Sequence, residues 1–330
     1  MSKNTNQEKF KTMIGGQALV EGIMMRGPKT DAIVVRTADG ISVETKPRKI
    51  RPKGSIGTWP LIRGAVGFFD AQVTGVKALM RSADLSPEGG EEPSSKFDQW
   101  LEKKLGQKKF QNFLIGTAVA FGLGMSILLF FLLPGLIVSL FDHFVDNMLV
   151  KNLIEGLIRI LIFLIYMIAV SCMKDMRRVF AYHGAEHKTI RCYEAGLPLT
   201  VENVRQQSCK HPRCGTSFLF VVMILSILVF SAASSLLLWA VPQLAELDGT
   251  IAYKAIMIGF KLLMIPVVVA FAYEINRLVG RYDNWFTRLM TWPGMLFQNF
   301  TTNEPDDSMI EVGIASLEAV LPEEAGTDLW

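Results

Sequence analysis

The chain has 330 residues, half of them apolar, and its mean hydropathy is positive. Soluble proteins rarely show this combination, so the composition argues against an ordinary soluble enzyme and indicates a membrane protein. The net charge of +3 is too small to indicate a nucleic-acid partner. The first thirty residues lack a basic start followed by an apolar core. We therefore predict no cleaved signal peptide and expect the first membrane span to act as the signal anchor.

Residues 13–83 are predicted to form a small cytoplasmic region that contains β-structure, after a disordered polar tail over residues 1–12. Its first segment, GGQALVEGIMMRGP, is dense in glycine, which suits tight turns or close approach of the backbone. Short β-favouring runs at 32–36 and 41–46 predict a β-hairpin. Apolar residues then recur at helical spacing over residues 59–81, which predicts an amphipathic helix.

Long apolar runs in the middle of the chain predict four transmembrane helices, because a bilayer core is crossed by roughly 20 apolar residues. A linker and a basic juxtamembrane helix over residues 84–109 precede them. The four predicted spans cover residues 110–141, 153–173, 215–241 and 255–273. The predicted fold is therefore mainly α, a polytopic membrane protein whose membrane domain extends over residues 110–275.

The positions of Lys and Arg predict the orientation of these spans. The connections over residues 142–152 and 242–254 contain one basic residue each, Lys151 and Lys254, whereas the loop over residues 174–214 contains eight. The positive-inside rule places the two poorly charged connections outside. We therefore expect the basic loop and both termini to lie in the cytoplasm, with the lipid bilayer of the cell membrane around the spans.

The C-terminal region, residues 276–330, is predicted to form two cytoplasmic helices. Aromatic residues recur among basic ones in its first half, which predicts a helix at the membrane interface. From Asp306 to Leu321, acidic residues precede apolar residues at helical spacing, which predicts a final amphipathic helix.

Three of the four histidines lie in the loop between the second and third spans. If the second span continues as a helix to Gly196, His183 and His187 lie one turn apart, with Glu186 beside them. This is the H-x-x-E-H arrangement of inverted zinc peptidases, in which two imidazoles hold the metal and the carboxylate takes a proton from its water. The pattern predicts His183 and His187 as ligands and Glu186 as the catalytic base. The alternative is a helix surface whose histidines bind nothing.

A second cluster precedes the third span, where Cys209, His211 and Cys214 occupy a short turn. Thiolate and imidazole ligands suit zinc, although the spacing is not that of a standard zinc finger. A helix hairpin would bring this turn close to the first motif, so we predict that one or more of the three residues complete the same metal site. A tight polar turn that enters the membrane is the alternative.

Five further residues are candidates for supporting roles. Glu194 and Glu202 could supply a third ligand or orient an imidazole, and Arg205 shares a short predicted helix with Glu202. Glu21 and Arg26 lie in the glycine-rich segment and could fold over the loop as a substrate wall.

Charged residues within the predicted spans have two interpretations. Lys261 would mark a cavity or an ion pair if it lay deep in the membrane, but its position allows it to reach the outer face. Glu155 and Arg159 lie in the same outer half. We therefore favour a structural role for these residues over an ion pathway.

Four segments together resemble the bacterial YqhQ membrane family: GGQALVEGIMMRGP, AYHGAEHKTIRCYEAG, LTVENVRQQSCKHPRCGTSF and TTNEPDD. The resemblance extends from about Gly15 to Leu321 and shows no departure within these motifs. The family is a domain of unknown function described as predicted metal-dependent enzymes. Membership would imply the bacterial inner membrane and a metal, and it adds no substrate.

The leading hypothesis is a membrane-embedded metal-dependent enzyme, a hydrolase that uses zinc or another divalent transition metal at a site facing the cytoplasm. The first alternative is a non-enzymatic scaffold or assembly factor, in which four protein ligands would hold a structural metal. The second alternative is a transporter that uses Lys261 and Glu155, which the lack of an internal repeat disfavours. The sequence selects no substrate and leaves a homo-oligomer open.

Overall fold

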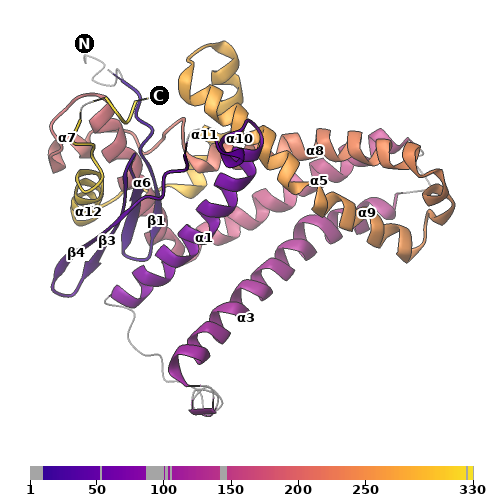
Figure 1. Cartoon of the computed structure of the whole chain (residues 1–330), viewed down its shortest axis with the longest axis horizontal. Helices are drawn as coiled ribbons and strands as arrows, with labels where there is room; N and C mark the ends of the chain where they lie inside the picture. Colours follow the sequence, from indigo (N-terminus) through magenta and orange to yellow (C-terminus); the bar gives the residue numbers. More distant parts are fainter. Residues whose placement is uncertain are drawn as a thin grey trace. The chain divides into compact units, whose positions relative to one another are not determined.

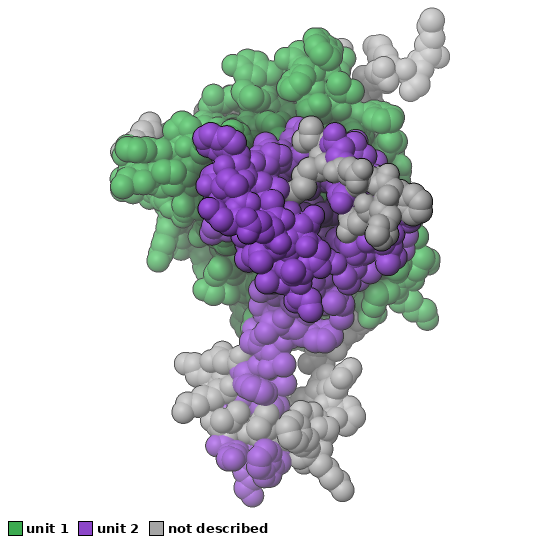
Figure 2. All heavy atoms as spheres, turned by 90° about the vertical axis from the view of Figure 1, so that its right-hand side faces the viewer, with its two compact units in different colours: residues 1–89, 167–226, 265–330 green, residues 90–166, 227–264 purple. Residues whose placement is uncertain are grey.

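The computed structural model describes residues 10–52, 54–86, 100, 103–104, 106–141, 147–324 and 326–329. The chain forms two compact units, which Figure 2 distinguishes by colour. Unit 1 comprises residues 1–89, 167–226 and 265–330, and unit 2 comprises residues 90–166 and 227–264. Most of the predicted linker before the first span lies outside the described residues, as do residues 1–9 of the predicted tail. Thr12, which that tail was expected to include, is buried.

Unit 1 contains a four-stranded antiparallel sheet within its described residues (Figure 1). Its strands are β1 (Gly15–Leu19), β2 (Gly22–Arg26), β3 (Thr30–Thr37) and β4 (Gly40–Pro47), and they pair in sequence order. The predicted hairpin is confirmed as β3 and β4. The glycine-rich segment is a strand pair, and its glycines permit close approach rather than a series of turns. A Cβ at Gly22 would overlap the Val34 carbonyl oxygen of β3.

Helices cover both faces of this sheet. On one face lie α6 (Lys174–Glu194) and α12 (Asp307–Glu318), and on the other lies α1 (Ile62–Leu85), which confirms the predicted amphipathic helix. Ile23 and Met25 of β2 belong to the first core, and Met24 between them belongs to the second. This alternation is the two-residue period of a β-strand that is buried on both faces.

The C-terminal region adds two helices to unit 1, as predicted. These are α11 (Trp285–Thr301), whose first residue is an exposed tryptophan, and α12. Asp306 begins α12 as its N-cap, because its side chain accepts a hydrogen bond of 3.0 Å from the Met309 backbone N–H. The segment between the two helices is thereby fixed against α6, where the Asn303 N–H donates to the Phe180 carbonyl at 2.8 Å.

Among the described residues, four helices are long and apolar enough to cross a membrane: Phe113–Ser139, Val150–Ser171, Gly215–Ala240 and Ile251–Arg281. They are built from α3 (Gln107–Ile127) with η2 (Leu128–Leu132) and α4 (Leu133–Ser139), α5 (Met148–Ser171), α8 (Gly215–Ala240), and α9 (Ile251–Leu263) with α10 (Ile265–Arg281). The predicted mainly helical, four-span fold is confirmed. These helices indicate a multi-pass membrane protein in contact with lipid.

Two of the spans are irregular at a proline. In the first span the helix becomes π-helical over Leu128–Leu132, just before Pro134. In the last span α9 ends and α10 begins around Met264, just before Pro266. Proline has no N–H to donate, and its ring obstructs the preceding turn, so the regular hydrogen-bond ladder is interrupted at both places.

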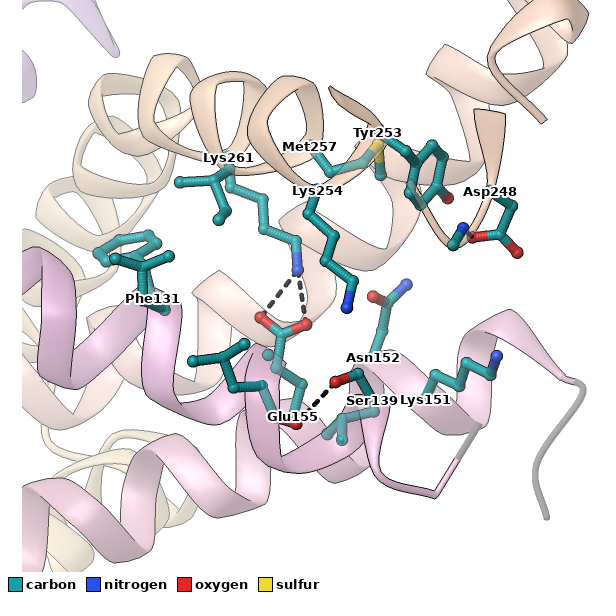
Figure 3. A pocket seen from close by; sticks show the side chains of 16 residues that line it. Phe131, Ser139, Lys151, Asn152, Glu155, Asp248, Tyr253, Lys254, Met257 and Lys261 are labelled. Atoms are coloured by element: carbon teal, nitrogen blue, oxygen red, sulfur yellow. Dashed lines mark hydrogen bonds and ion pairs between the residues drawn. The ribbon is translucent and has the colours of Figure 1, made fainter. Parts of the chain in front are cut away.

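Unit 2 contains an ion cluster within the spans (Figure 3). Lys261 Nζ donates to both Glu155 carboxylate oxygens, at 2.8 and 2.6 Å, and Arg159 donates to Glu155 at 2.7 Å. A cavity of about 190 Å³ adjoins the cluster. Lys261, which we expect to be able to reach the outer face, thus forms an ion pair with Glu155. A membrane-embedded cation is less costly when a carboxylate pairs with it, and here α5 supplies that carboxylate.

Candidate metal centre

The first motif lies on α6, which is a helix separate from the second span. We expected that span to continue to Gly196, but α5 ends at Ser171 and α6 begins at Lys174. Between them Met173 has an extended backbone, with φ −73° and ψ 137°. The side chains change there from apolar to charged, so the two helices suit different surroundings. α6 ends at Glu194, and Gly196 adopts the left-handed φ of +63° that glycine tolerates best.

Three side chains converge on one point at this helix. His183 and His187 lie one turn apart on α6, and Cys214 immediately precedes α8. One ligand atom from each lies within 4.8 Å of the other two. His183 Nε2 is 3.2 Å from Cys214 Sγ, and the two imidazole centroids are 4.3 Å apart. Within the described part of the chain, these residues form a group that could hold one metal ion.

Backbone carbonyl groups orient both imidazoles. The Nδ1 atom of His183 lies 2.7 Å from the Thr301 carbonyl oxygen, and that of His187 lies 2.6 Å from the Cys209 carbonyl oxygen. A carbonyl can only accept, so each Nδ1 carries the proton and donates, and each Nε2 is left to act as a ligand. His187 Nε2 is buried and has no hydrogen-bond partner among the described residues. Such an orphaned atom is what a metal ligand shows before its metal binds.

The electrostatics of the group suit a thiolate ligand. Burial alone would raise the pKa of the Cys214 thiol, but the charges of His187 and His183, together with the hydrogen bond to His183, lower it well below its ordinary value. Burial alone would lower the pKa of His183, but the charge of Cys214 and its hydrogen bond raise it to about 9. A lowered thiol pKa favours the thiolate, which is the form of cysteine that binds a metal.

Glu186 lies beside the three candidate ligands, and one of its two carboxylate oxygens makes a hydrogen bond. Its Oε1 accepts a hydrogen bond of 3.0 Å from the Gly16 N–H of β1, and its buried Oε2 has no partner among the described residues. Only glycine allows this approach, because a Cβ at Gly16 would lie 2.9 Å from Glu186 Cδ. Burial raises the pKa of Glu186 above its ordinary value. The geometry suits a general base or acid beside a metal.

The other two members of the second cluster have different partners. Cys209 Sγ donates to Glu304 Oε2 at 3.1 Å, and His211 Nε2 lies 3.1 Å from Glu194 Oε2. Neither belongs to the convergent group. Burial and the hydrogen bond to Glu304 raise the pKa of the Cys209 thiol to about 12, which disfavours a thiolate. Of the three residues in the turn, the structure brings Cys214 to the histidines, and Cys209 contributes its backbone carbonyl.

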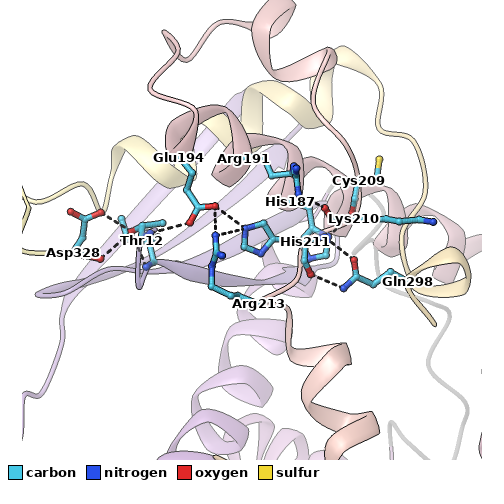
Figure 4. A network of polar contacts seen from close by, with 11 residues as sticks. Thr12, His187, Arg191, Glu194, Cys209, Lys210, His211, Arg213, Gln298 and Asp328 are labelled. Atoms are coloured by element: carbon cyan, nitrogen blue, oxygen red, sulfur yellow. Dashed lines mark hydrogen bonds and ion pairs between the residues drawn. The ribbon is translucent and has the colours of Figure 1, made fainter. Parts of the chain in front are cut away.

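A polar network holds the turn that carries Cys214 (Figure 4). The buried Glu194 carboxylate accepts from the Thr12 N–H at 2.9 Å and also contacts His211 and Arg213. Gln298 of α11 accepts from the His211 N–H and donates to the His211 carbonyl, both at 2.8 Å. Glu194, predicted as a ligand or supporting residue, supports the turn. Thr12 and Gln298 are far away in sequence, and nothing local to either marks this role.

The remaining candidates from the sequence lie away from the three ligands. Glu21 pairs with Arg178 and accepts from the Tyr182 hydroxyl at 3.1 Å, so it ties the β1–β2 turn to α6. Arg205 pairs with Asp307. Glu202 lies on the same short helix, α7 (Val201–Arg205), and is exposed.

Arg26 lines a cavity that opens beside the metal group. The cavity has a volume of about 240 Å³, and Gly16, Glu186, His187 and Cys214 form part of its wall. A small substrate entering it would therefore meet both the orphaned imidazole nitrogen and the candidate base. Arg26 lines this cavity, and its role in a substrate wall stays a prediction.

Comparisons with known proteins agree with the sequence resemblance. The sequence model of a family described as "Protein of unknown function (DUF1385)" matches residues 59–323. The chain is also 33% identical over 325 residues to "Uncharacterized protein YqhQ" of Bacillus subtilis (strain 168), an alignment that covers 97% of this chain and 96% of that protein. No solved structure matches the chain. The alignment with the Bacillus protein includes both the metal group and nearly all of the N-terminal region, whereas the family model begins after the sheet.

Proposed function

The chain belongs to the DUF1385 family, whose function is unknown, and we propose from the geometry of its own residues that it is a membrane-embedded metal-dependent hydrolase. His183, His187 and Cys214 would hold zinc or another divalent transition metal, and Glu186 would act as general base. The observation that carries the proposal is that three ligands, rather than four, converge among the described residues, beside a buried carboxylate oxygen that has no hydrogen-bond partner there.

The number and kind of the ligands favour a catalytic zinc. Imidazole and thiolate suit zinc, and catalytic zinc sites use three protein ligands so that a fourth position stays open for water or substrate. A structural site would be closed by a fourth protein ligand. Among the described residues the group has three members, so the arrangement supports the enzyme over the scaffold. When bound, zinc would acidify a water molecule and polarise the bond to be broken.

The residues of the chain itself would perform three tasks. The Thr301 and Cys209 carbonyl groups hold each imidazole with its Nε2 toward the site. The Gly16 N–H fixes one oxygen of Glu186, so the other oxygen can take a proton from water and deliver it to the leaving group. Apolar residues of the sheet and α6 pack beside these side chains, and the low polarity of that core strengthens each of these interactions.

We further propose that the site faces the cytoplasm. Support comes from the basic residues of the segment that contains α6, together with the poorly charged connections at the other ends of the spans. Reporter fusions placed after residue 148 and after residue 195 would test this orientation. A periplasm-active reporter that works only after residue 195 would reverse it.

Metal analysis combined with hydrolysis assays tests the function. We would purify the full chain in detergent, beside His183→Ala, His187→Ala, Cys214→Ala and Glu186→Gln, and measure zinc by mass spectrometry. The first three variants should lose zinc. Glu186→Gln should keep it and lose hydrolysis of a panel of chromogenic esters, phosphate esters and peptides. Cys209→Ala is the matched thiol control and should keep both zinc and activity.

Two outcomes would reject the proposal. If all three ligand variants kept stoichiometric zinc, the metal group would be wrong. If zinc bound as expected but Glu186→Gln hydrolysed the panel as fast as the unchanged chain, Glu186 would not be the base and the proposed mechanism would be wrong.

A further inference from the structure

The cavity beside the metal group is lined by three arginines, none of which belongs to the candidate metal ligands. Arg26, Arg48 and Arg213 all contribute to its wall, whereas Glu186 is the one acidic residue among the described residues that line it. We call this cavity the arginine chamber. We propose that the arginine chamber binds an oxyanion of the substrate, a phosphate or a carboxylate, and that Arg26 and Arg48 are the residues that recognise it. This inference rests on the proposed function, since it names the substrate class of the same site.

Arg48 lines the chamber and makes no direct ion pair with a carboxylate of the described residues. It follows β4, and its NH1 donates to the Gly27 carbonyl oxygen at 2.9 Å. No carboxylate of the described residues lies within 4.0 Å of its guanidinium. Burial of part of the side chain and the neighbouring charge of Arg26 lower the pKa of Arg48 below its ordinary value, although the charges of Asp31 and Asp70 act in the opposite direction. Arg48 is exposed, so an anion that enters the chamber from solvent can reach its guanidinium.

Arg26 is held by two carboxylates, but only at long distances. Its Nε is 3.4 Å from Asp31, and its NH2 is 3.6 Å from Asp70. These carboxylates position the side chain, and donors of the guanidinium remain for a ligand, because five N–H groups are available in all. Two guanidinium groups that repel each other beside one cavity are stabilised together when an anion binds between them.

Arg213 completes the positive wall and links it to the metal group. Its side chain is only 8% exposed and pairs with Glu194, and the next residue is the candidate ligand Cys214. An anion in the chamber would therefore lie near both the metal and a fixed positive charge. Such a charge favours a substrate whose negative charge increases as water attacks it.

The chemistry of guanidinium indicates the kind of ligand. Its planar fork donates two parallel hydrogen bonds to a phosphate or carboxylate, which is a stronger and more directional contact than lysine provides. Apolar lining from Ile14 and Ile190 leaves room for a small neutral part of the same molecule. A cationic substrate is disfavoured, because Arg26, Arg48 and Arg213 all line the chamber.

Binding of simple anions tests the inference on the zinc-loaded, detergent-purified full chain. Inorganic phosphate and, separately, acetate would be titrated by calorimetry, with sodium chloride of equal ionic strength as the reference. We expect saturable binding that Arg26→Gln and Arg48→Gln each weaken about tenfold, the effect of losing one charge-assisted contact. Arg48→Lys should recover part of the loss. Lys49→Gln removes an equal charge from the neighbouring residue, which does not line the chamber, and should bind as the unchanged chain does.

Zinc content separates this inference from the proposed function. Equal zinc in all variants with weaker binding in the two Gln variants supports both. Stronger binding of phosphate identifies a phosphate-bearing substrate, and stronger binding of acetate identifies a carboxylate. The inference is overturned if neither anion binds above chloride, or if Arg48→Gln and Lys49→Gln bind equally. Anion binding that depends on Arg48 in a chain that takes no zinc would keep the anion site and overturn the hydrolase.

Discussion

Substitution of Glu194 by glutamine should destabilise the turn that carries Cys214. The Glu194 carboxylate is fully buried and accepts from the Thr12 N–H, and it also contacts His211 and Arg213. Glutamine has nearly the same shape but no charge, and its NH₂ group must replace either the oxygen that accepts from Thr12 or the oxygen that contacts His211 and Arg213. The variant therefore removes a buried ion pair and creates an unfavourable donor–donor contact without opening a cavity.

The size of the effect follows from burial. Removing one partner of a buried ion pair costs about 3–5 kcal/mol, because the other charge stays in the interior. For a domain of this size, each kcal/mol lowers Tm by about 2–4 °C, so the variant should melt roughly 6–20 °C lower. Because Arg213 precedes Cys214, zinc affinity should also fall about 10- to 100-fold, as is usual when a residue that supports a ligand is lost.

The effect should depend on pH in a defined direction. Burial alone would raise the pKa of Glu194, but the hydrogen bond to His211 and the charges of His211 and Arg213 lower it below its ordinary value. A carboxyl whose folded pKa is lowered stabilises the fold above its unfolded pKa of about 4.3, and this stabilisation is lost as the pH falls through the folded pKa. The gap in Tm should therefore stay constant from pH 8 to pH 5 and narrow in stronger acid.

Intrinsic tryptophan fluorescence during heating, in detergent and across this pH range, measures the gap, and mass spectrometry measures zinc. Glu202→Gln is the control, because it removes an exposed carboxylate from the adjacent α7. Equal Tm values for Glu194→Gln and Glu202→Gln at pH 7 would refute the argument from burial. A gap that widened on acidification would refute the argument from charge.

Three further substitutions test separate parts of the structure. Gly16→Ala should keep zinc, lower the free energy of unfolding by about 1–3 kcal/mol and reduce activity, because its Cβ would lie 2.9 Å from Glu186 Cδ. Full activity of this variant would contradict the close approach. Cys209→Ser should leave zinc content unchanged, since this thiol lies outside the ligand group; loss of zinc would return it to the ligands. Glu155→Gln should lower Tm strongly in detergent, because Lys261 loses its carboxylate; an unchanged Tm would mean that the cluster is not stabilising.

Some features of this molecule follow from sequence because short-range physics determines them. A run of about 20 apolar residues is long enough to cross the core of a bilayer, so the four spans were predictable. The spacing of His183, Glu186 and His187 places them on one face of any helix, so this part of the candidate site was predictable too. The cap at Asp306 is similarly local.

Other features depend on contacts between distant segments and could not be predicted. The choice of Cys214 rather than Cys209 is made by the path of the turn, which Gln298 fixes from α11. Gly16 contacts Glu186 only because β1 packs on α6. The β1–β2 pair was missed because its strands are five residues each and rich in glycine, a composition that local rules assign to turns.

A ligand set of two histidines and one cysteine is also used by copper proteins that transfer electrons, so the ligands alone leave two chemistries open. Glu186 separates them. An electron-transfer site needs no proton acceptor. A buried carboxylate oxygen without a hydrogen-bond partner among the described residues would destabilise the fold there and serve no function. Glycine at position 16 allows the backbone to hold that carboxylate in place, and the cavity gives a substrate access to it. A base, an open coordination position and a route for substrate are what hydrolysis requires together.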